Sequence, residues 1–171
     1  MESVYVVEPK SRSDLRNLAV AIRKALKLKD CLYFPAVEVL EILHYFDPEV
    51  HFEIVPFDEL GPNTHADTDI VNKVIRIRED VYERACKGNG RDRMTVVHEI
   101  AHFMMICICG FKLSRSFNVP VETCRDPEWQ AKCLAGELMM DYRLIKGMTA
   151  TEVADACGVS LDAAEYQLSK I

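Results

Sequence analysis

The sequence predicts an α+β fold with one main domain, residues 1–147, and a small C-terminal helical hairpin, residues 148–171. A length of 171 residues suits a single core, and 49% hydrophobic with 28% charged residues is an ordinary globular composition. Patterns with helical periodicity come first, short alternating runs follow, and helical patterns then return. Because strands and helices are segregated along the chain, we expect a small sheet beside helices.

The first third of the chain predicts two helices and a strand. Residues 13–29 repeat apolar side chains at helical spacing, and Ser13 is the expected N-cap. Pro35 suits the first turn of a second helix, which we expect to reach Phe46. Residues 50–55 alternate in polarity and are rich in β-forming residues, so they predict a strand.

The middle of the chain predicts a hairpin and two more helices. Residues 64–70 and 73–78 are short extended runs on either side of a two-residue turn. Residues 79–87 predict a short helix. Residues 92–109 predict a long apolar helix that Gly110 ends.

A further helix has clear start signals. Residues 112–125 predict an irregular connection, after which Asp126 is suited to the N-cap and Pro127 to the first helical position. Glu128 follows in the first turn, where the helix dipole favours an acidic side chain. We expect this helix to run to about Asp141.

Charge and cysteine content disfavour several classes of protein. A net charge of −6 disfavours a nucleic-acid-binding surface, because phosphate contacts require clustered Lys and Arg. The seven cysteines include no Cys-Xaa-Xaa-Cys spacing and no signal peptide precedes them, so we expect free thiols and a cytoplasmic protein. Cys107 and Cys109 would point apart on a helix, which disfavours a metal site there. Residues 94–108 are mostly apolar, but the segment is too short to span a membrane and it includes polar residues.

The segment HEIAH, residues 98–102, predicts a metal site. Residues four apart share one face of a helix, so His98 and His102 can both bind a single ion. Glu99 lies where it can reach a water beside that ion without being a ligand. This is the arrangement of a zinc-dependent peptidase, in which Glu99 is the general base.

The alternative is that HEIAH is a chance pattern on a core helix. Apolar residues surround it on nearly every side, which predicts that the helix is buried. Two imidazoles and a carboxylate in a buried helix are costly unless something satisfies them, and a metal ion does so. The context therefore favours the metal site. The flanking apolar residues are Met94, Val96, Val97, Ile100, Ala101, Phe103, Met104 and Met105.

A zinc ion with two His ligands needs a third protein ligand. Glu128 lies at the edge of the apolar stripe of its helix, although a solvated first-turn carboxylate is an equal alternative there. The residues alone leave the ligand open. The other candidates are His44, His51, His65, Asp126 and Glu137.

Two motifs resemble those of the ImmA/IrrE family of metallopeptidases. Residues 93–102 (RMTVVHEIAH) resemble its Arg-Phe-Thr-(small)-HExxH segment, and residues 128–140 (EWQAKCLAGELMM) resemble its second motif. The likeness extends from about residue 67 to the C-terminus. It implies a zincin-like, gluzincin-type domain with Glu128 as the third zinc ligand. It also implies cleavage of a helix-turn-helix repressor of a mobile element or stress operon.

The chain departs from the family pattern at several positions. Met94 and Leu134 replace aromatic residues, which should alter only packing. Asp141 stands where a proline usually ends the second motif, and residues 107–110 replace a His- and Leu-rich continuation. None of these changes removes a proposed ligand or the base.

The remaining polar residues predict less. Amide hydrolysis needs a donor for the oxyanion, and His65 and Tyr142 lie near the motifs, but ordinary surface or packing roles are favoured for both. Asp67 and Asp69 are expected to serve the hairpin turn.

The tail from residue 149 resembles a helix-turn-helix, with Gly158-Val159-Ser160 between two helical patterns. Its second helix carries one basic residue, Lys170, whereas a DNA-reading helix needs several polar and basic side chains. We therefore expect it to pack on the main domain or to dock the substrate.

The sequence as a whole predicts a cytoplasmic zinc metalloendopeptidase. His98 and His102 would bind Zn²⁺ and Glu99 would be catalytic. The resemblance implies that Glu128 is the third ligand and that a helix-turn-helix repressor is the protein substrate. The alternative is a non-catalytic, metal-stabilised module that sequesters a repressor or antitoxin. A transcription factor is disfavoured by the charge, and we expect neither direct DNA binding nor membrane association.

Overall fold

The computed structural model describes residues 3–117 and 120–171. Within these ranges the chain is α+β and mostly helical, as predicted, with eight α-helices, a three-stranded sheet and a separate two-stranded sheet. Among the described residues, none of the helices combines the length and apolarity that a bilayer span requires.

Both predicted N-terminal helices are present, but the first ends at Ala25 rather than at residue 29, and the second is α-helical only to Glu41 rather than to Phe46. Helix α1 (Arg12–Ala25) begins one residue before Ser13, so the prediction that Ser13 is the N-cap was wrong. Ser11 is the cap, because its hydroxyl accepts from the Asp14 backbone N–H while the Asp14 carboxylate accepts from the Ser11 N–H. Helix α2 (Ala36–Glu41) follows Pro35 and continues into a 3₁₀ turn, Leu43–Tyr45.

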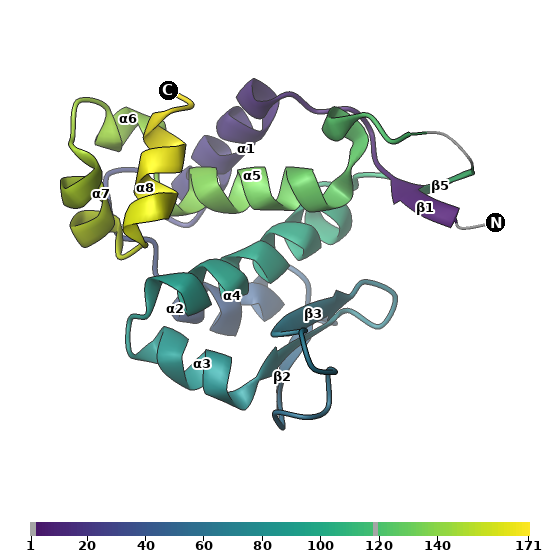
Figure 1. The fold of residues 1–171 in the computed structure, drawn as a ribbon. Coiled ribbons are helices and arrows are strands. Elements are labelled where there is room, and N and C mark those ends of the chain that lie inside the picture. The colour runs from purple at the N-terminus through teal and green to yellow at the C-terminus, as the bar shows by residue number, and fades with distance from the viewer. Residues whose placement is uncertain (1–2, 118–119) are drawn as a thin grey trace.

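The three-stranded sheet contains the predicted strand and hairpin. Its order is β2 (His51–Val55), β4 (Val74–Arg78), β3 (Ala66–Asp69), with β4 parallel to β2 and antiparallel to β3. Ile75 and Ile77 of the central strand are fully buried. Strand β3 therefore forms an edge of this sheet, beside α4 (Figure 1).

Helix α3 (Glu79–Cys86) leads into α4 (Gly90–Phe103), whose N-terminus is capped by Asn89. The predicted helix through Cys109 is π-helical over Met104–Ile108, and the Cys109 N–H donates to the Met104 carbonyl at 2.8 Å. The wider turn keeps both Met104 and Met105 in the core.

A two-stranded sheet was not predicted. Strand β5 (Ser114–Phe117) pairs antiparallel with β1 (Ser3–Val6), so the expectation of an irregular connection over residues 112–125 was wrong for that part. The strands have four residues each and lie far apart in the chain, so no local turn signal reveals their pairing. A 3₁₀ turn, Thr123–Arg125, follows, and residues 118–119 of the expected connection lie outside the described residues.

Helix α5 (Pro127–Met139) begins with the predicted cap, Asp126. After α6 (Tyr142–Ile145), the tail forms the two predicted short helices, α7 (Ala150–Cys157) and α8 (Leu161–Leu168). Val153, Cys157, Val159 and Ala164 of this tail join the same hydrophobic core as α4 and α5.

Buried Arg93 of α4 fixes the C-terminal hairpin. Its guanidinium donates to the carbonyls of Phe34, Cys157 and Gly158 and lies 3.8 Å from the centre of the Tyr33 ring. Gly158 has a φ of +62°, and a Cβ there would collide with the Arg93 guanidinium. The turn of the hairpin therefore requires glycine at this position.

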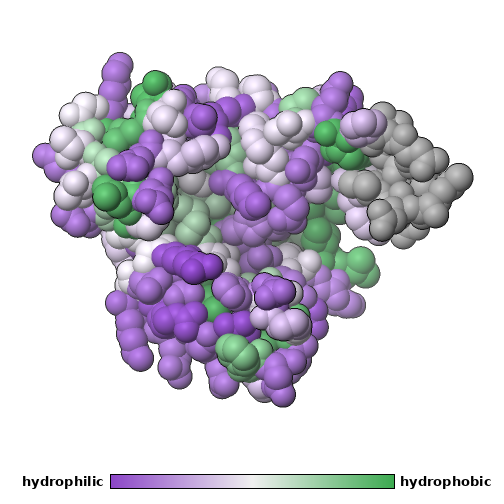
Figure 2. Space-filling model, viewed as in Figure 1, coloured by the Kyte–Doolittle hydropathy of each residue, from purple (hydrophilic) through white to green (hydrophobic). Residues whose placement is uncertain are grey.

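Helix α4 crosses the middle of the molecule (Figure 1). Helices α1 and α5 and the C-terminal helices lie on one side of it, and α2, α3 and the three-stranded sheet lie on the other. Figure 2 shows that hydrophilic residues dominate the visible surface over the α3 and sheet side. The apolar faces of both layers meet on α4, whose Val96, Val97, Ile100 and Ala101 are fully buried.

Candidate metal centre

Helix α4 presents its two histidines on one face. His98 and His102 lie one turn apart, with ring centroids 4.7 Å apart and ring planes nearly perpendicular. Their Nε2 atoms are 3.1 Å apart. This spacing places both Nε2 atoms where a single ion could bind them.

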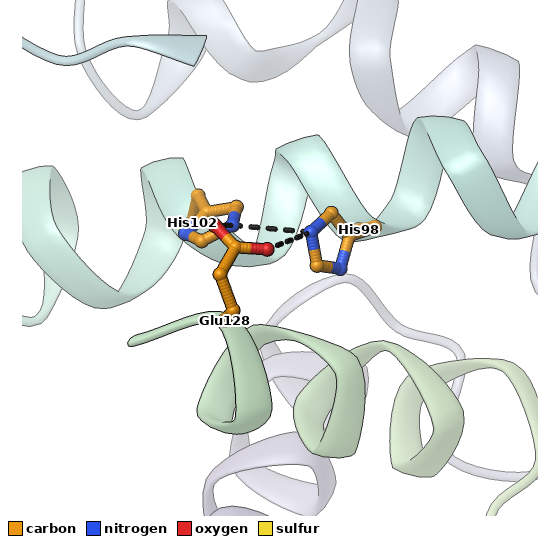
Figure 3. A group of neighbouring side chains, drawn as sticks. All are labelled: His98, His102 and Glu128. Atoms are coloured by element: carbon orange, nitrogen blue, oxygen red, sulfur yellow. Dashed lines mark hydrogen bonds and ion pairs between the residues drawn. The ribbon is translucent and has the colours of Figure 1, made fainter. Parts of the chain in front are cut away.

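Helix α5 brings Glu128 to the two histidines. Asp126 caps the helix by accepting from the Glu128 N–H at 2.9 Å, which fixes the first turn. Glu128 Oε2 lies 3.2 Å from His98 Nε2, and Oε1 lies 3.1 Å from His102 Nε2 (Figure 3). Hydrogen bonds from the two imidazoles hold the pKa of Glu128 well below its usual range.

These three side chains could hold a metal ion. They form the group of potential ligands found among the described residues, with one donor atom from each lying within 4.8 Å of the others. A tetrahedral ion with bonds of about 2.0–2.1 Å separates its ligand atoms by about 3.3 Å. The Nε2 atoms of the two histidines, 3.1 Å apart, approach this separation, and each lies 3.1–3.2 Å from a different oxygen of Glu128. The donor set therefore fits a small divalent cation.

Glu99 lies beside the group without joining it. The residue is 7% exposed, and its Oε2 accepts a hydrogen bond of 2.7 Å from the Thr68 hydroxyl on β3. Burial raises the pKa of Glu99 above its ordinary value, and the hydrogen bond from Thr68 opposes this change. A carboxyl group held in this way suits proton transfer.

A cavity of about 610 Å³ opens over the group. Its walls come from β1, from β3 and the turn after it, from α4 and the π-helical turn, and from the start of α5. The Glu128 side chain is 60% exposed, whereas those of His98 and His102 are 18% and 12% exposed. A ligand in the cavity can therefore reach all three. The lining residues are Tyr5, Ala66, Asp67, Thr68, Asp69, Ile70, Val71, His98, Glu99, His102, Ile106, Leu113, Pro127 and Glu128.

The other candidate ligands lie elsewhere. His44 and His51 line a separate cavity between α2 and β2. The His65 carbonyl accepts from the Arg78 N–H, and the residue does not line the cavity over the metal group. Asp126 serves as a helix cap, and buried Glu137 pairs with Arg12 and Arg16. Glu128 is thus the candidate that the fold brings to the two histidines.

The minor candidates also have other environments. Tyr142 packs under the Arg16 guanidinium, 4.8 Å from its ring centre, and does not line the cavity. Cys107 and Cys109 belong to no potential metal group among the described residues, and all seven cysteines are free thiols. Asp69 accepts from the turn N–H groups of Val71 and Asn72, as predicted. Asp67 instead pairs across the strands with Arg76, so its assignment to the turn was wrong.

Sequence reasoning missed two residues of the site. Thr68 contacts Glu99, and Tyr5 of β1 lines the cavity. Nothing local in the sequence related strand β3 to α4. In comparisons with known proteins, no family model, no curated protein and no solved structure matched the chain.

Proposed function

We propose that this protein is a zinc-dependent endopeptidase with a zincin-like catalytic domain. The observation that carries the proposal is a buried carboxyl group, Glu99, beside an open group of three potential ligands. A structural metal site is closed by four protein ligands and has no use for an adjacent carboxylate, whereas a catalytic site keeps a position open.

Zinc is the metal proposed for His98, His102 and Glu128. Two imidazoles and one carboxylate, with one ligand atom from each within 4.8 Å of the others, are a donor set of catalytic zinc. When bound, zinc polarises a peptide carbonyl and lowers the pKa of a water towards 7. Harder ions such as Mg²⁺ prefer oxygen ligands, so they fit this set less well.

The residues of the chain supply the proton transfers. Glu99 takes a proton from the attacking water and then delivers it to the amine that leaves the cleaved peptide bond. The Thr68 hydroxyl, 2.7 Å away, holds the carboxyl group in place during both transfers. Burial of Glu99 favours its protonated form, which makes the first transfer, from the water to the carboxylate, easier.

The edge strand supports a peptide substrate. Strand β3 pairs with β4 on one side, and its residues Ala66 to Asp69 line the cavity. The other edge of such a strand can pair with an extended peptide through backbone hydrogen bonds. A peptide added there would run along the cavity that contains the metal ligands.

We further propose membership of the ImmA/IrrE family and a helix-turn-helix repressor as the substrate. The proposal rests on the two motifs, residues 93–102 and 128–140, whose members meet at the site through His98 and Glu128. The net charge of −6 complements a basic DNA-binding partner.

The rival proposal is a metal-stabilised module that binds a repressor without cutting it. The two proposals differ in what Glu99→Gln should do. In a peptidase this variant retains the metal and the fold but loses cleavage, because the amide cannot accept the proton. In a binding module it changes nothing that can be measured.

The test combines metal analysis with a cleavage assay. Wild type and Glu99→Gln are reconstituted with zinc, analysed for metal content, and incubated with a helix-turn-helix repressor encoded beside the gene and with a random peptide library. We expect one zinc per chain in both proteins and cleavage by the wild type alone. Full cleavage by Glu99→Gln, or no zinc in either protein, would contradict the proposal. Zinc without cleavage in both would favour the binding module.

A further inference from the structure

A second cavity, of about 270 Å³, adjoins the metal centre. It lies between α4, α5 and α8, and His98 borders both cavities. Its wall is mainly apolar and includes Met94 of α4, Trp129 and Met140 from α5 and its end, and Ala163 of α8. Figure 2 shows hydrophobic residues interspersed with hydrophilic ones over the C-terminal helices.

One buried polar group of this wall lacks a partner. Gln167 of α8 is 1% exposed, and its Nε2 has no hydrogen-bond partner among the described residues. The amide oxygen lies over Gly136, where an added Cβ would be only 3.1 Å away. Gly136 thus leaves the space that the amide occupies. A buried donor without a partner is unfavourable, so an acceptor from a ligand would stabilise it.

The wall also includes two basic side chains. Arg12 donates to the Tyr166 hydroxyl at 3.2 Å, and the exposed Lys132 borders the cavity. No carboxylate lines this cavity among the described residues. The cavity therefore combines an apolar wall with one unpartnered hydrogen-bond donor, the Gln167 amide, which suits an apolar group that ends in an acceptor.

The size and position of the cavity indicate what occupies it. A volume of about 270 Å³ is below the ~300–1,000 Å³ typical of pockets for free drug-sized ligands. A single side chain fits better. Because His98 lines both cavities, a peptide bound over the metal group lies next to the smaller cavity.

We propose that this cavity, the α8 pocket, selects the substrate by receiving one of its side chains, an apolar one that ends in a hydrogen-bond acceptor, as tyrosine does. The inference rests on the proposed endopeptidase function, because the peptide must first lie over the metal centre. Gln167 Nε2 donates to the acceptor, and Trp129 and Met94 contact the apolar part. The C-terminal hairpin is then a specificity element of the peptidase.

Trp129 provides a readout that needs neither metal nor cleavage. It is the single tryptophan of the chain and lines the α8 pocket. Its emission would be followed during titration with N-acetyl-tyrosinamide and with N-acetyl-phenylalaninamide, in metal-free and in zinc-loaded protein. We expect saturable changes with both, and at least about fivefold tighter binding of the tyrosine compound, because only it satisfies the buried donor.

Three variants test the assignment. Ala163→Leu fills the pocket and should abolish the saturable change with both compounds. Gln167→Leu removes the donor and should equalise the two affinities without loss of fold, which circular dichroism checks. Glu165→Ala, on the exposed face of α8, is the matched control and should behave as wild type. An unchanged response in Ala163→Leu, or an unchanged tyrosine preference in Gln167→Leu, would overturn the proposal.

Cleavage then separates this inference from the proposed function. A zinc-loaded wild type that cleaves peptides should prefer tyrosine to alanine at one position next to the cleaved bond, and Ala163→Leu should remove that preference. Active enzyme with the same preference in both proteins contradicts the α8 pocket alone. Probe binding in a protein that neither holds zinc nor cleaves peptides contradicts the endopeptidase function and, with it, the role in substrate selection.

Discussion

The Thr68 hydroxyl lies 2.7 Å from Glu99 Oε2, so the edge strand β3 holds the carboxyl group that follows the first histidine of α4. The same hydroxyl lies 3.3 Å from the Glu99 carbonyl oxygen. The contact joins the sheet to the helix at the point where both line the larger cavity. It therefore links the part of the site that would bind a peptide to the part that would cut it.

Replacing Thr68 tests this link. Thr68→Val keeps the shape of the side chain but leaves Glu99 without its hydroxyl partner, so the carboxyl group loses its fixed orientation. We expect kcat/KM for peptide cleavage to fall by about 10–100-fold, as for other residues that orient a metal site from the outside, with zinc content unchanged. Thr68→Ser retains the hydroxyl and should retain most activity. Equal rates for Thr68→Val and wild type would contradict the positioning role.

Removing Glu128 tests the ligand set. Glu128→Ala leaves two histidines on α4, and we expect zinc affinity to fall by more than about 100-fold, beyond the loss caused by an outer-shell residue. Competition with a zinc-binding dye measures this affinity. His102→Ala should behave alike, whereas Glu122→Ala, an exposed carboxylate of the preceding loop, should bind zinc as wild type does. Tight binding in Glu128→Ala would remove Glu128 from the proposed site.

Local patterns predicted the elements that contain the site. The four-residue spacing of His98 and His102 and the Asp126-Pro127 start of α5 are short-range signals, and both helices are present as predicted. The residue pattern alone did not identify the third metal ligand, because its identity depends on how α5 packs on α4. Only the resemblance to a family favoured Glu128, and the structure brings that residue to the histidines.

Long-range pairing was not predictable in the same way. The partner of Glu99, Thr68, lies 31 residues away, and β1 pairs with β5 across more than half of the chain. The prediction of the N-cap of α1 was wrong because Ser11 and Ser13 are both suitable caps. The choice between them depends on Asp14, three residues after Ser11. Local sequence signals thus predicted the helices and the three-stranded sheet, whereas the β1–β5 pair and the side chains that meet in the site depend on tertiary packing.

Burial of Cys133 predicts a loss of stability at alkaline pH. Burial raises the pKa of this thiol from 9.0 to about 11, so the folded chain keeps a proton that the unfolded chain loses. Its contribution to stability is complete below pH 9 and is lost between pH 9 and 11, up to about 3 kcal/mol. Urea unfolding at pH 8, 9 and 10 should show a shallower decline for Cys133→Ala than for wild type.

The matched control for this prediction is Cys31→Ala, because Cys31 is exposed. Its unfolding free energy should decline with pH as steeply as that of the wild type. Alkylation gives an independent check: at pH 8 in the native state, iodoacetamide should modify Cys31 and Cys86 while Cys133 and Cys157 stay unmodified, because the latter two are buried. Rapid modification of Cys133 in the native protein would contradict its burial.

Asp141 has a structural role in this protein. At this position the ImmA/IrrE family, which the sequence resembles, usually has a proline. Its Oδ1 accepts from the Arg143 N–H at 3.0 Å and caps α6, and its Oδ2 lies 3.4 Å from Nε of Arg23. Both side chains of the pair with Arg23 are buried, at 1% and 0% exposure. Although burial alone would raise it, the pKa of Asp141 is lowered by hydrogen bonds from Arg143 and by the charge of Arg23.

Asp141→Asn should therefore be strongly destabilising, because it leaves the buried Arg23 charge without its counterion. Removal of one partner of a buried ion pair costs about 3–5 kcal/mol, which urea unfolding at pH 7 would measure.

The stability that Asp141 contributes should also depend on pH. Because its pKa is lowered in the folded chain, this contribution is fully present above the ordinary pKa of 3.8 and is lost as the pH falls below about 4. The variant should therefore lose less stability than wild type between pH 4 and pH 2. The control is Asp30→Asn, because Asp30 is an exposed partner of Lys29, and it should change the free energy of unfolding by less than about 0.5 kcal/mol. An equally small effect of Asp141→Asn would contradict the buried ion pair.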